Sequence, residues 1–312
     1  MRLTLSPLAL ALAALMLGAC TPASQDAPAD AATTDATTDA AAAADAKAEA
    51  DLRNAETDPL DAILAGDWRD PANVARDAFR HPRETLAFFG VGPSQTVVEI
   101  SPGAGWYTEI LAPLAQGKGR YIGVLNDPAK AGSERATEYY ANANAKFREK
   151  LAAHADVYAN ASLIEVDPKA PVFGEPGSAD VVLTFRNVHN WVGAGSEAAM
   201  FKGFYDVLAP GGVLGVVEHR AAAGKTLEEV VESGYLPEDY VVGLATAAGF
   251  VLEEKSEVNA NPADTKDHPN GVWTLPPGNR HDEADKAKYA AIGESDRMTL
   301  RFVKPQAEAA AE

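Results

Sequence analysis

The chain has 312 residues, of which 46% are hydrophobic, and this is enough apolar material to form a sizeable folded domain. Its 45 acidic residues outnumber its 27 basic residues, and the formal net charge is -18 at pH 7. Binding to nucleic acid phosphates needs clustered lysine and arginine, and no basic stripe occurs in the sequence. The composition therefore argues against a nucleic acid partner.

The first twenty residues predict export. A short basic start at Met1 and Arg2 precedes an apolar run over residues 3–17, which three polar or proline residues interrupt. A membrane span needs about 20 consecutive apolar residues, so this run is too short for one. It ends in Leu17-Gly18-Ala19-Cys20, with small residues immediately before the cysteine. This is typical of a signal peptide over residues 1–19.

The segment around Cys20 resembles the lipobox of bacterial lipoproteins. The resemblance implies cleavage before Cys20 and a lipid anchor on its side chain, which would be the only link to a membrane. We therefore expect a periplasm-facing protein of the bacterial cell envelope, and Thr21 favours the outer membrane over the inner one. An ordinary signal peptide or a single membrane anchor is the alternative.

Cys20 is also the only cysteine, which excludes an intramolecular disulfide and a zinc–thiolate site. Residues 20–58 are mostly Ala, Asp, Thr, Pro and Glu. Such a segment cannot bury enough apolar surface to offset its ordering entropy, so we expect a disordered tether. Residues 305–312 form a similar tail, which leaves residues 59–304 as one folded domain.

Predicted strands and predicted helices alternate along this domain. Strands are predicted at residues 96–100, 120–125, 162–166, 179–185, 213–218, 250–256 and 300–303. Two short helices are predicted within 59–80, and further helices at 82–89, 106–114, 128–155, 196–208 and 237–248. This alternation predicts an α/β fold with a mostly parallel sheet covered by helices on both faces.

The loop after the first strand carries the main functional pattern. Its sequence is Glu99-Ile100-Ser101-Pro102-Gly103-Ala104-Gly105, and it leads from a strand into a helix. Glycines in this context let the backbone approach a nucleotide closely. Taken alone, the loop fits a dinucleotide, a nucleoside or a tight turn. A nicotinamide-dependent oxidoreductase is disfavoured, because Thr108 stands where its third glycine belongs.

Residues 97–105 resemble motif I of the class I S-adenosylmethionine-dependent methyltransferases, an acid-x-Gly-x-Gly-x-Gly pattern. The acid maps onto Glu99, the last two glycines onto Gly103 and Gly105, and Ser101 replaces the first glycine. The resemblance implies a Rossmann-like sheet with one antiparallel strand among parallel ones. It also implies that this loop binds the methionine end of S-adenosylmethionine and that Glu99 orients its amino group.

Later segments keep the order of the same family, over roughly residues 84–303. Asp167 maps onto the acid that contacts adenine, and residues 184–191, which include Asn187, resemble the loop after the fourth strand of quinone-type methyltransferases. The family's ribose-binding acid is absent, since Leu125 holds its place. Asn126 or Asp127 would have to substitute. Residues 259–277 are typical of a bacterial group of predicted methyltransferases.

Methyl transfer needs positioning, and a base where the acceptor loses a proton. His189 lies in the loop expected to face the methyl group, and Glu218 and His219 end the fifth predicted strand. We predict these three as catalytic or acceptor-contacting residues. Arg186 either binds an acidic acceptor or pairs with a neighbouring carboxylate. No metal is predicted, since a cluster of His189, His219 and His268 with Glu218 or Asp267 lacks any metal-binding spacing.

Residues 259–280 form an unusually long loop that contains His268, Trp273 and Arg280. Such loops are often lids over active sites, and a packed insertion is the alternative. The predicted function is methyl transfer from S-adenosylmethionine to a small-molecule acceptor. The competing hypothesis is a non-catalytic binding or sensing protein, because the cofactor is made in the cytosol and Leu125 weakens ribose recognition.

Overall fold

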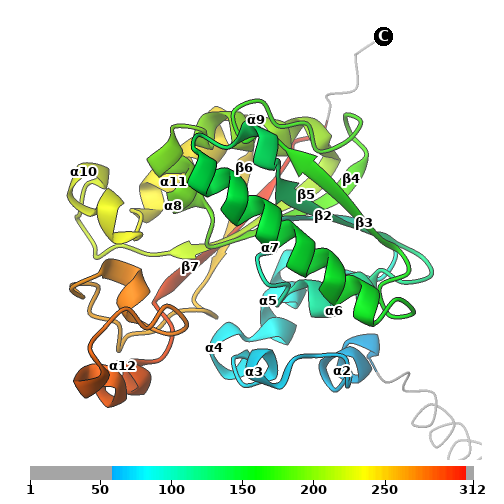
Figure 1. Cartoon of the computed structure of the whole chain (residues 1–312). Coiled ribbons are helices and arrows are strands. Elements are labelled where there is room, and N and C mark those ends of the chain that lie inside the picture. The colour runs from blue at the N-terminus through cyan, green and yellow to red at the C-terminus, as the bar shows by residue number, and fades with distance from the viewer. Residues whose placement is uncertain (1–57, 307–312) are drawn as a thin grey trace, which may run out of the picture. The chain divides into compact units, whose positions relative to one another are not determined.

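We describe residues 58–306 of a computed structural model (Figure 1). The predicted signal peptide, Cys20, the tether up to residue 57 and the tail from residue 307 lie outside these residues. None of the helices described is both long and apolar enough to cross a membrane.

The seven strands form a single sheet in the order β3-β2-β1-β4-β5-β7-β6. Strands β1 to β5 pair in parallel, and β7 runs antiparallel between β5 and β6. This confirms the expected sheet with one antiparallel strand. The strands are β1 (Thr96–Ile100), β2 (Arg120–Asn126), β3 (Ala161–Val166), β4 (Ala179–Phe185), β5 (Leu208–His219), β6 (Val251–Ser256) and β7 (Arg297–Val303).

Helices cover both faces of the sheet (Figure 1). The α-helices are α2 (Pro59–Leu64), α3 (Pro71–Val74), α4 (Asp77–Arg80), α5 (Pro82–Phe89), α6 (Thr108–Leu114), α7 (Glu134–Ala153), α8 (Val188–Ala194), α9 (Glu197–Val207), α10 (Leu227–Val230), α11 (Glu238–Ala247) and α12 (Lys286–Ile292). Short 3-10 helices are η1 (Pro128–Lys130), η2 (Val231–Ser233), η3 (Gly271–Thr274) and η4 (Glu283–Asp285).

Two apolar cores explain why these strands form the centre of the fold. Successive side chains of a strand point to opposite faces of a sheet. In β1, Val98 and Ile100 join the core that includes residues of α8, α9 and α11. Val97 joins the other core, with residues of α2, α5 and α6. Strand β1 is therefore buried on both faces, whereas the edge strands β3 and β6 are partly exposed.

The structure differs from the sequence prediction in several helices. Residues 59–80 contain three short helices instead of two, and η1 precedes α7. The expected loop after β4 contains helix α8, which ends at Gly195 in the left-handed conformation (φ 64°). Gly193 and Gly195 lie close together in the sequence, and for this reason the helix was not predicted. β5 begins at Leu208, because residues 209–212 form an irregularity inside the strand instead of a turn before it.

Candidate functional site

The glycine-rich loop joins β1 to α6 at the carboxyl edge of the sheet, and its backbone is left-handed at three positions. The φ angles are 50° at Ser101, 61° at Gly103 and 83° at Gly105. A Cβ atom on Gly103 would meet no heavy atom within 4 Å, whereas one on Gly105 would lie 2.9 Å from Cε2 of Phe147. Gly103 therefore faces open space, and Gly105 allows α7 to pack on the loop.

Two cavities meet at this loop. The first has a volume of about 390 Å³ and lies between the loop, the end of β2, α7 and α8. The second has a volume of about 200 Å³ and lies between the loop, the end of β4 and the N-terminal helices. Ser101, Pro102, Gly103 and Asn187 line both cavities. Ligands of open α/β sheets bind at this edge, so the two cavities together form the candidate site.

Glu99 is buried in β1 and lines the smaller cavity. Its Oε2 accepts hydrogen bonds from Thr108 Oγ1 (2.8 Å) and the Tyr121 hydroxyl (2.7 Å). Burial raises the pKa of Glu99 to about 7, although the two hydroxyl donors and Arg186 act to lower it. The predicted cofactor-binding acid is thus at the site and is close to half protonated near neutrality.

The end of β2 is where the resemblance places a ribose-binding acid. Leu125 and Asn126 line the larger cavity. Asp127 does not, because its carboxylate caps η1 by accepting from the Ala129 backbone N–H (2.8 Å). Asp167 is also outside the cavity lining, and accepts instead from the Lys169 N–H (2.9 Å), while Pro168 lines the cavity.

Asn187 and α7 complete the larger cavity. The Asn187 side chain donates to the carbonyl of Ile100 (2.9 Å), which links the end of β4 to the glycine-rich loop. Tyr139, Tyr140 and Phe147 of α7 contribute aromatic walls, and Trp191 of α8 closes the opposite side. The sequence did not single out α7, because its strongly polar composition is typical of a solvated helix.

His189, Glu218 and His219, which were predicted from the sequence as catalytic, converge at the ends of β4 and β5. His189 Nδ1 lies 3.0 Å from Glu218 Oε1, and His219 Nδ1 lies 2.5 Å from Ser295 Oγ. The two imidazole rings are 5.2 Å apart, and the Trp273 ring is 6.1 Å from His189. Burial lowers the pKa of His219 well below its ordinary value, and His189 and Arg186 add to the effect.

Among residues 58–306, these three side chains also form a group whose potential metal-ligand atoms lie within 4.8 Å of one another. The carboxylate of Glu218 is already occupied, however. It accepts from the backbone N–H groups of Val188 (2.6 Å) and His219 (2.7 Å), and more distantly from that of His189 (3.4 Å), in addition to the imidazole. A carboxylate offers about four acceptor positions, so this one is suited to orienting His189.

An arginine cluster, which the sequence analysis largely missed, lies beside the smaller cavity. Arg76, Arg80 and Arg186 line it. Arg76 Nε (2.7 Å), Arg80 Nε (3.1 Å) and Arg297 Nη1 (2.9 Å) all bind the single carboxylate of Glu294. Burial raises the pKa of Glu294, but the surrounding arginines outweigh burial and bring it down to about 2. The spacing of Arg76 and Arg80, four residues apart, was the available signal.

Arg186 differs from the other three arginines. Its backbone is left-handed (φ 61°), and its guanidinium makes no hydrogen bond or ion pair with any residue between 58 and 306. Burial lowers the pKa of Arg186, and neighbouring Arg297 adds to this, against the attraction of Glu294. The carboxylate pairing considered for Arg186 is absent from the part of the chain described, which leaves its role as an anion ligand open.

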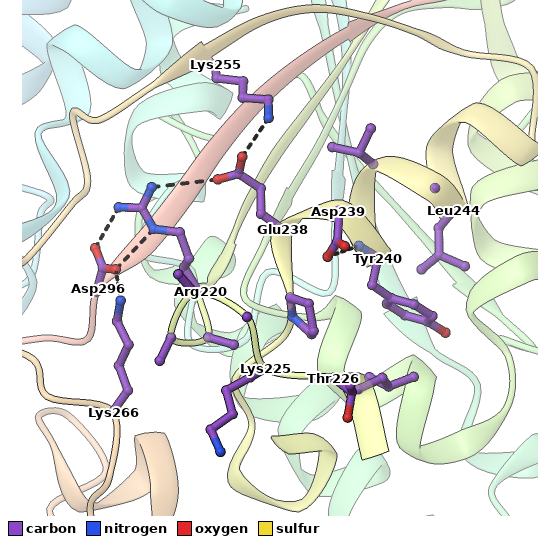
Figure 2. A pocket seen from close by; sticks show the side chains of 18 of the residues that line it. Arg220, Lys225, Thr226, Glu238, Asp239, Tyr240, Leu244, Lys255, Lys266 and Asp296 are labelled. Carbon is purple, nitrogen blue, oxygen red and sulfur yellow. Dashed lines mark hydrogen bonds and ion pairs between the residues drawn. The ribbon is translucent and has the colours of Figure 1, made fainter. Parts of the chain in front are cut away.

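A larger cavity of about 1280 Å³ lies beyond the end of β5, between residues 220–227 and α11. Figure 2 shows that Arg220 reaches both Asp296 (3.0 Å) and Glu238 (3.6 Å). Lys225, another cation of the lining, binds Glu229 (2.9 Å). Lys255 binds Glu238, and Lys266 binds Asp296, at 2.7 Å each. This cavity therefore presents no unsatisfied charge comparable to that of Arg186.

The long segment between β6 and β7 is largely a packed insertion. Asp264 is buried and accepts from the Tyr235 hydroxyl (2.9 Å), His268 Nε2 (2.8 Å) and the Asp296 N–H (2.8 Å). This contact with the buried Asp264 carboxylate gives His268 a structural role. Pro277 is the part of the insertion that lines the smaller cavity, and Trp273 stands beside His189. A lid-like movement of this segment stays a prediction.

Comparison with solved structures agrees with this topology. A proposed sarcosine dimethylglycine methyltransferase from Galdieria sulphuraria has a TM-score of 0.52 at 13% identity, and the match covers 77% of this chain and 91% of that one. The chain has a class I methyltransferase fold. A SAM-dependent methyltransferase from Aquifex aeolicus matches with a TM-score of 0.47 at 16% identity, over 75% of this chain and 94% of that one.

A fold can host many activities, so the fold alone does not name one. The [4+2]-cyclase SpnF is a further match, with a TM-score of 0.49 and 16% identity, over 80% of this chain and 92% of that one. No protein-family model matches the sequence, and no curated protein sequence matches it. Function must therefore be argued from the residues of the site.

Proposed function

We propose that the protein transfers a methyl group from S-adenosylmethionine to a small molecule. The observation that carries this proposal is the pair of cavities joined at the glycine-rich loop, because their shapes and linings differ in the way the two ends of this cofactor differ. The larger cavity has aromatic walls suited to an adenine ring. The smaller one has charged and polar walls suited to an amino acid.

The residues present fit this cofactor. Gly103 has open space on its Cβ side, so the backbone there can be approached closely. Ser196 lines the larger cavity, and its buried Oγ has no hydrogen-bond partner among the residues described. Asn126, which follows Leu125 in the sequence, is a polar residue of the same lining. Glu99, with Ser101 and Gly103, would hold the amino acid end, and Asn187 would lie between the two ends.

When bound, the cofactor supplies a sulfonium-activated methyl group, and the protein has only to position the acceptor and remove its proton. His189 lines neither cavity, but it lies two residues from Asn187, which lines both. Glu218 contacts the His189 ring at Nδ1 (3.0 Å), and Nε2 would be the atom that accepts the proton of the acceptor. His219 stays neutral because of burial and therefore does not repel the proton that His189 gains. This arrangement favours an acceptor that loses a proton, such as a hydroxyl group.

The first test is isothermal titration of the full chain with S-adenosylmethionine and S-adenosylhomocysteine. We expect both to bind, and the methyl-labelled cofactor to label one or more members of a panel of small hydroxyl and carboxylate compounds. Absence of binding at millimolar cofactor would refute the proposal. Binding without any transfer would favour the alternative, a ligand-binding protein on this fold, to which the apolar Leu125 at the ribose position also points.

His189 is the second part of the test. With an acceptor identified by that panel, His189→Ala should lower kcat by about a hundredfold or more and leave S-adenosylhomocysteine binding unchanged. Glu218→Gln should also lower kcat, because the base loses its orienting partner. His154→Ala, at the exposed end of α7, is the control. Turnover that is unaffected by loss of His189 would remove this residue from the mechanism.

A further inference from the structure

The smaller cavity carries more positive charge than its carboxylates neutralise. Four guanidinium groups, those of Arg76, Arg80, Arg186 and Arg297, surround it or pack beside it. Within residues 58–306 they form ion pairs with one carboxylate of this cluster, that of Glu294, which binds three of them. Glu99 also lines the cavity, but burial raises its pKa to about 7, so it supplies at most a partial negative charge near neutrality.

Three donor groups of this cluster lack a partner. Arg76 Nη2 and Arg297 Nε are buried without a hydrogen bond to any residue described. The guanidinium of Arg186, a half-buried residue, has neither a hydrogen bond nor an ion pair in the same part of the chain, and its side chain lines the cavity. Unpaired buried donors are costly, and charged donors more so. An anionic ligand in the cavity would supply acceptors to the guanidinium groups of Arg76 and Arg186.

The cofactor alone does not supply this charge. S-adenosylmethionine has one carboxylate, but it also has an ammonium and a sulfonium group, so its binding adds net positive charge to a cavity that already has an excess. In a buried site such like charges repel strongly. A second, negatively charged molecule beside the cofactor would relieve this repulsion, and in the proposed reaction the second molecule is the acceptor.

We propose that the methyl acceptor is a small oxyanion-bearing molecule, a carboxylate or a phosphate ester, whose negative group binds Arg186 and Arg76. The planar guanidinium fork matches both kinds of anion. The inference rests on the proposed function, since it assigns the acceptor of that reaction. It also predicts that anion and cofactor assist each other's binding, because each lowers the electrostatic cost of the other.

The cavity beyond the end of β5 supports this assignment, because its charges are arranged differently. There Arg220 contacts Glu238, Glu257 and Asp296, and Lys255 and Lys266 are paired as well. A cavity whose cations are already neutralised has no electrostatic need for an anion. The unpaired Arg186 is thus a feature of the candidate site and does not recur among the cations of that second cavity.

The experiment measures S-adenosylmethionine binding to the full chain by calorimetry, with sulfate or acetate as the probe anion and chloride at matched ionic strength as the reference. We expect one of the two anions to raise cofactor affinity about fivefold or more in the unmodified chain. A larger effect of sulfate on cofactor affinity would indicate a phosphate-like acceptor. A larger effect of acetate would indicate a carboxylate acceptor. S-adenosylhomocysteine, which lacks the sulfonium charge, should depend less on the anion.

The matched variants are Arg186→Gln and Arg120→Gln, since Arg120 is exposed at the start of β2, at the opposite edge of the sheet. The anion effect should disappear in the first variant and persist in the second. Arg76→Gln, at a half-buried position, serves if Arg186→Gln does not fold, and should reduce the effect.

Three outcomes are decisive. Cofactor binding that sulfate and acetate leave unchanged would overturn the anion proposal and leave the methyltransferase proposal standing. An anion effect of equal size in Arg186→Gln would also overturn it. In the third outcome, neither S-adenosylmethionine nor S-adenosylhomocysteine binds, but sulfate raises the thermal stability of the unmodified chain and not of Arg186→Gln. This result would support the anion site and refute the methyltransferase proposal.

Discussion

At the scale of single residues, the position of Glu99 at the candidate site was predicted from the sequence, but its protonation was not. Its position was predictable, because the acid precedes the glycine-rich loop by a fixed spacing. Its protonation was not, because that depends on burial and on Thr108 and Tyr121, which donate to it from α6 and β2. Sequence identifies the titratable group, while its pKa is set by neighbours distant in the chain.

Glu99 should make stability depend on pH. Its pKa rises from 4.5 to about 7 on folding, so the folded state holds the proton more tightly than the unfolded chain does. This contribution is complete below pH 4.5 and is lost as the pH rises to about 7. In chemical denaturation, the unfolding free energy of the unmodified chain relative to Glu99→Gln should fall by up to about 1.4 kcal/mol per pH unit across that window.

Glutamine keeps an oxygen that can accept from Thr108 and Tyr121, so the variant removes mainly the titration. Glu254→Gln, an exposed change on β6, is the control and should track the unmodified chain. A constant difference between Glu99→Gln and the unmodified chain from pH 4 to pH 8 would contradict a raised pKa.

At the scale of elements, the strands were predicted well because most of them are short apolar runs with a glycine or proline nearby. The helices were predicted less well. α8 lay unnoticed within a supposed loop, and α7 was identified as a helix without its role as a wall of the larger cavity. The predicted adenine and ribose acids, Asp167 and Asp127, cap local turns and do not line the larger cavity, and their role in cofactor binding stays a prediction. A motif predicts the order of residues along the chain. It does not predict the direction in which the side chain of its last residue points.

The packing of α7 on the glycine-rich loop predicts different effects of alanine at two nearby glycines. Both adopt positive φ, so alanine strains the backbone at either position, by about 1–2 kcal/mol. At Gly105 the new methyl group also meets Phe147 and Lys150, while at Gly103 it meets nothing. Gly105→Ala should therefore lower the melting temperature clearly more than Gly103→Ala.

The opposite order is expected for ligand binding, since Gly103 lines both cavities and Gly105 lines neither. Titration with S-adenosylhomocysteine checks this second half. Equal losses of stability at the two positions would mean that α7 does not pack on the loop as described.

At the scale of the whole molecule, the sequence predicts a lipid-anchored envelope protein, and this stays a prediction because Cys20 lies outside the residues described. Cys20→Ala should abolish incorporation of labelled fatty acid and release the protein from the membrane fraction, measured by metabolic labelling and fractionation of cells that produce the full chain. Thr21→Ala, beside the predicted cleavage site, should keep the label. Labelling that survives loss of Cys20 would refute the lipid anchor.

The position of β7 has a consequence for how the site comes into being. The last strand in sequence lies inside the sheet, between β5 and the edge strand β6, and the segment just before it supplies Glu294 and Ser295. Their partners, Arg80 and His219, come much earlier in the chain. A chain still emerging from a ribosome or a translocation channel thus has no complete site, and truncation of the chain before residue 295 should abolish the site together with the sheet. Activity would be gained only once the whole domain has been delivered and folded.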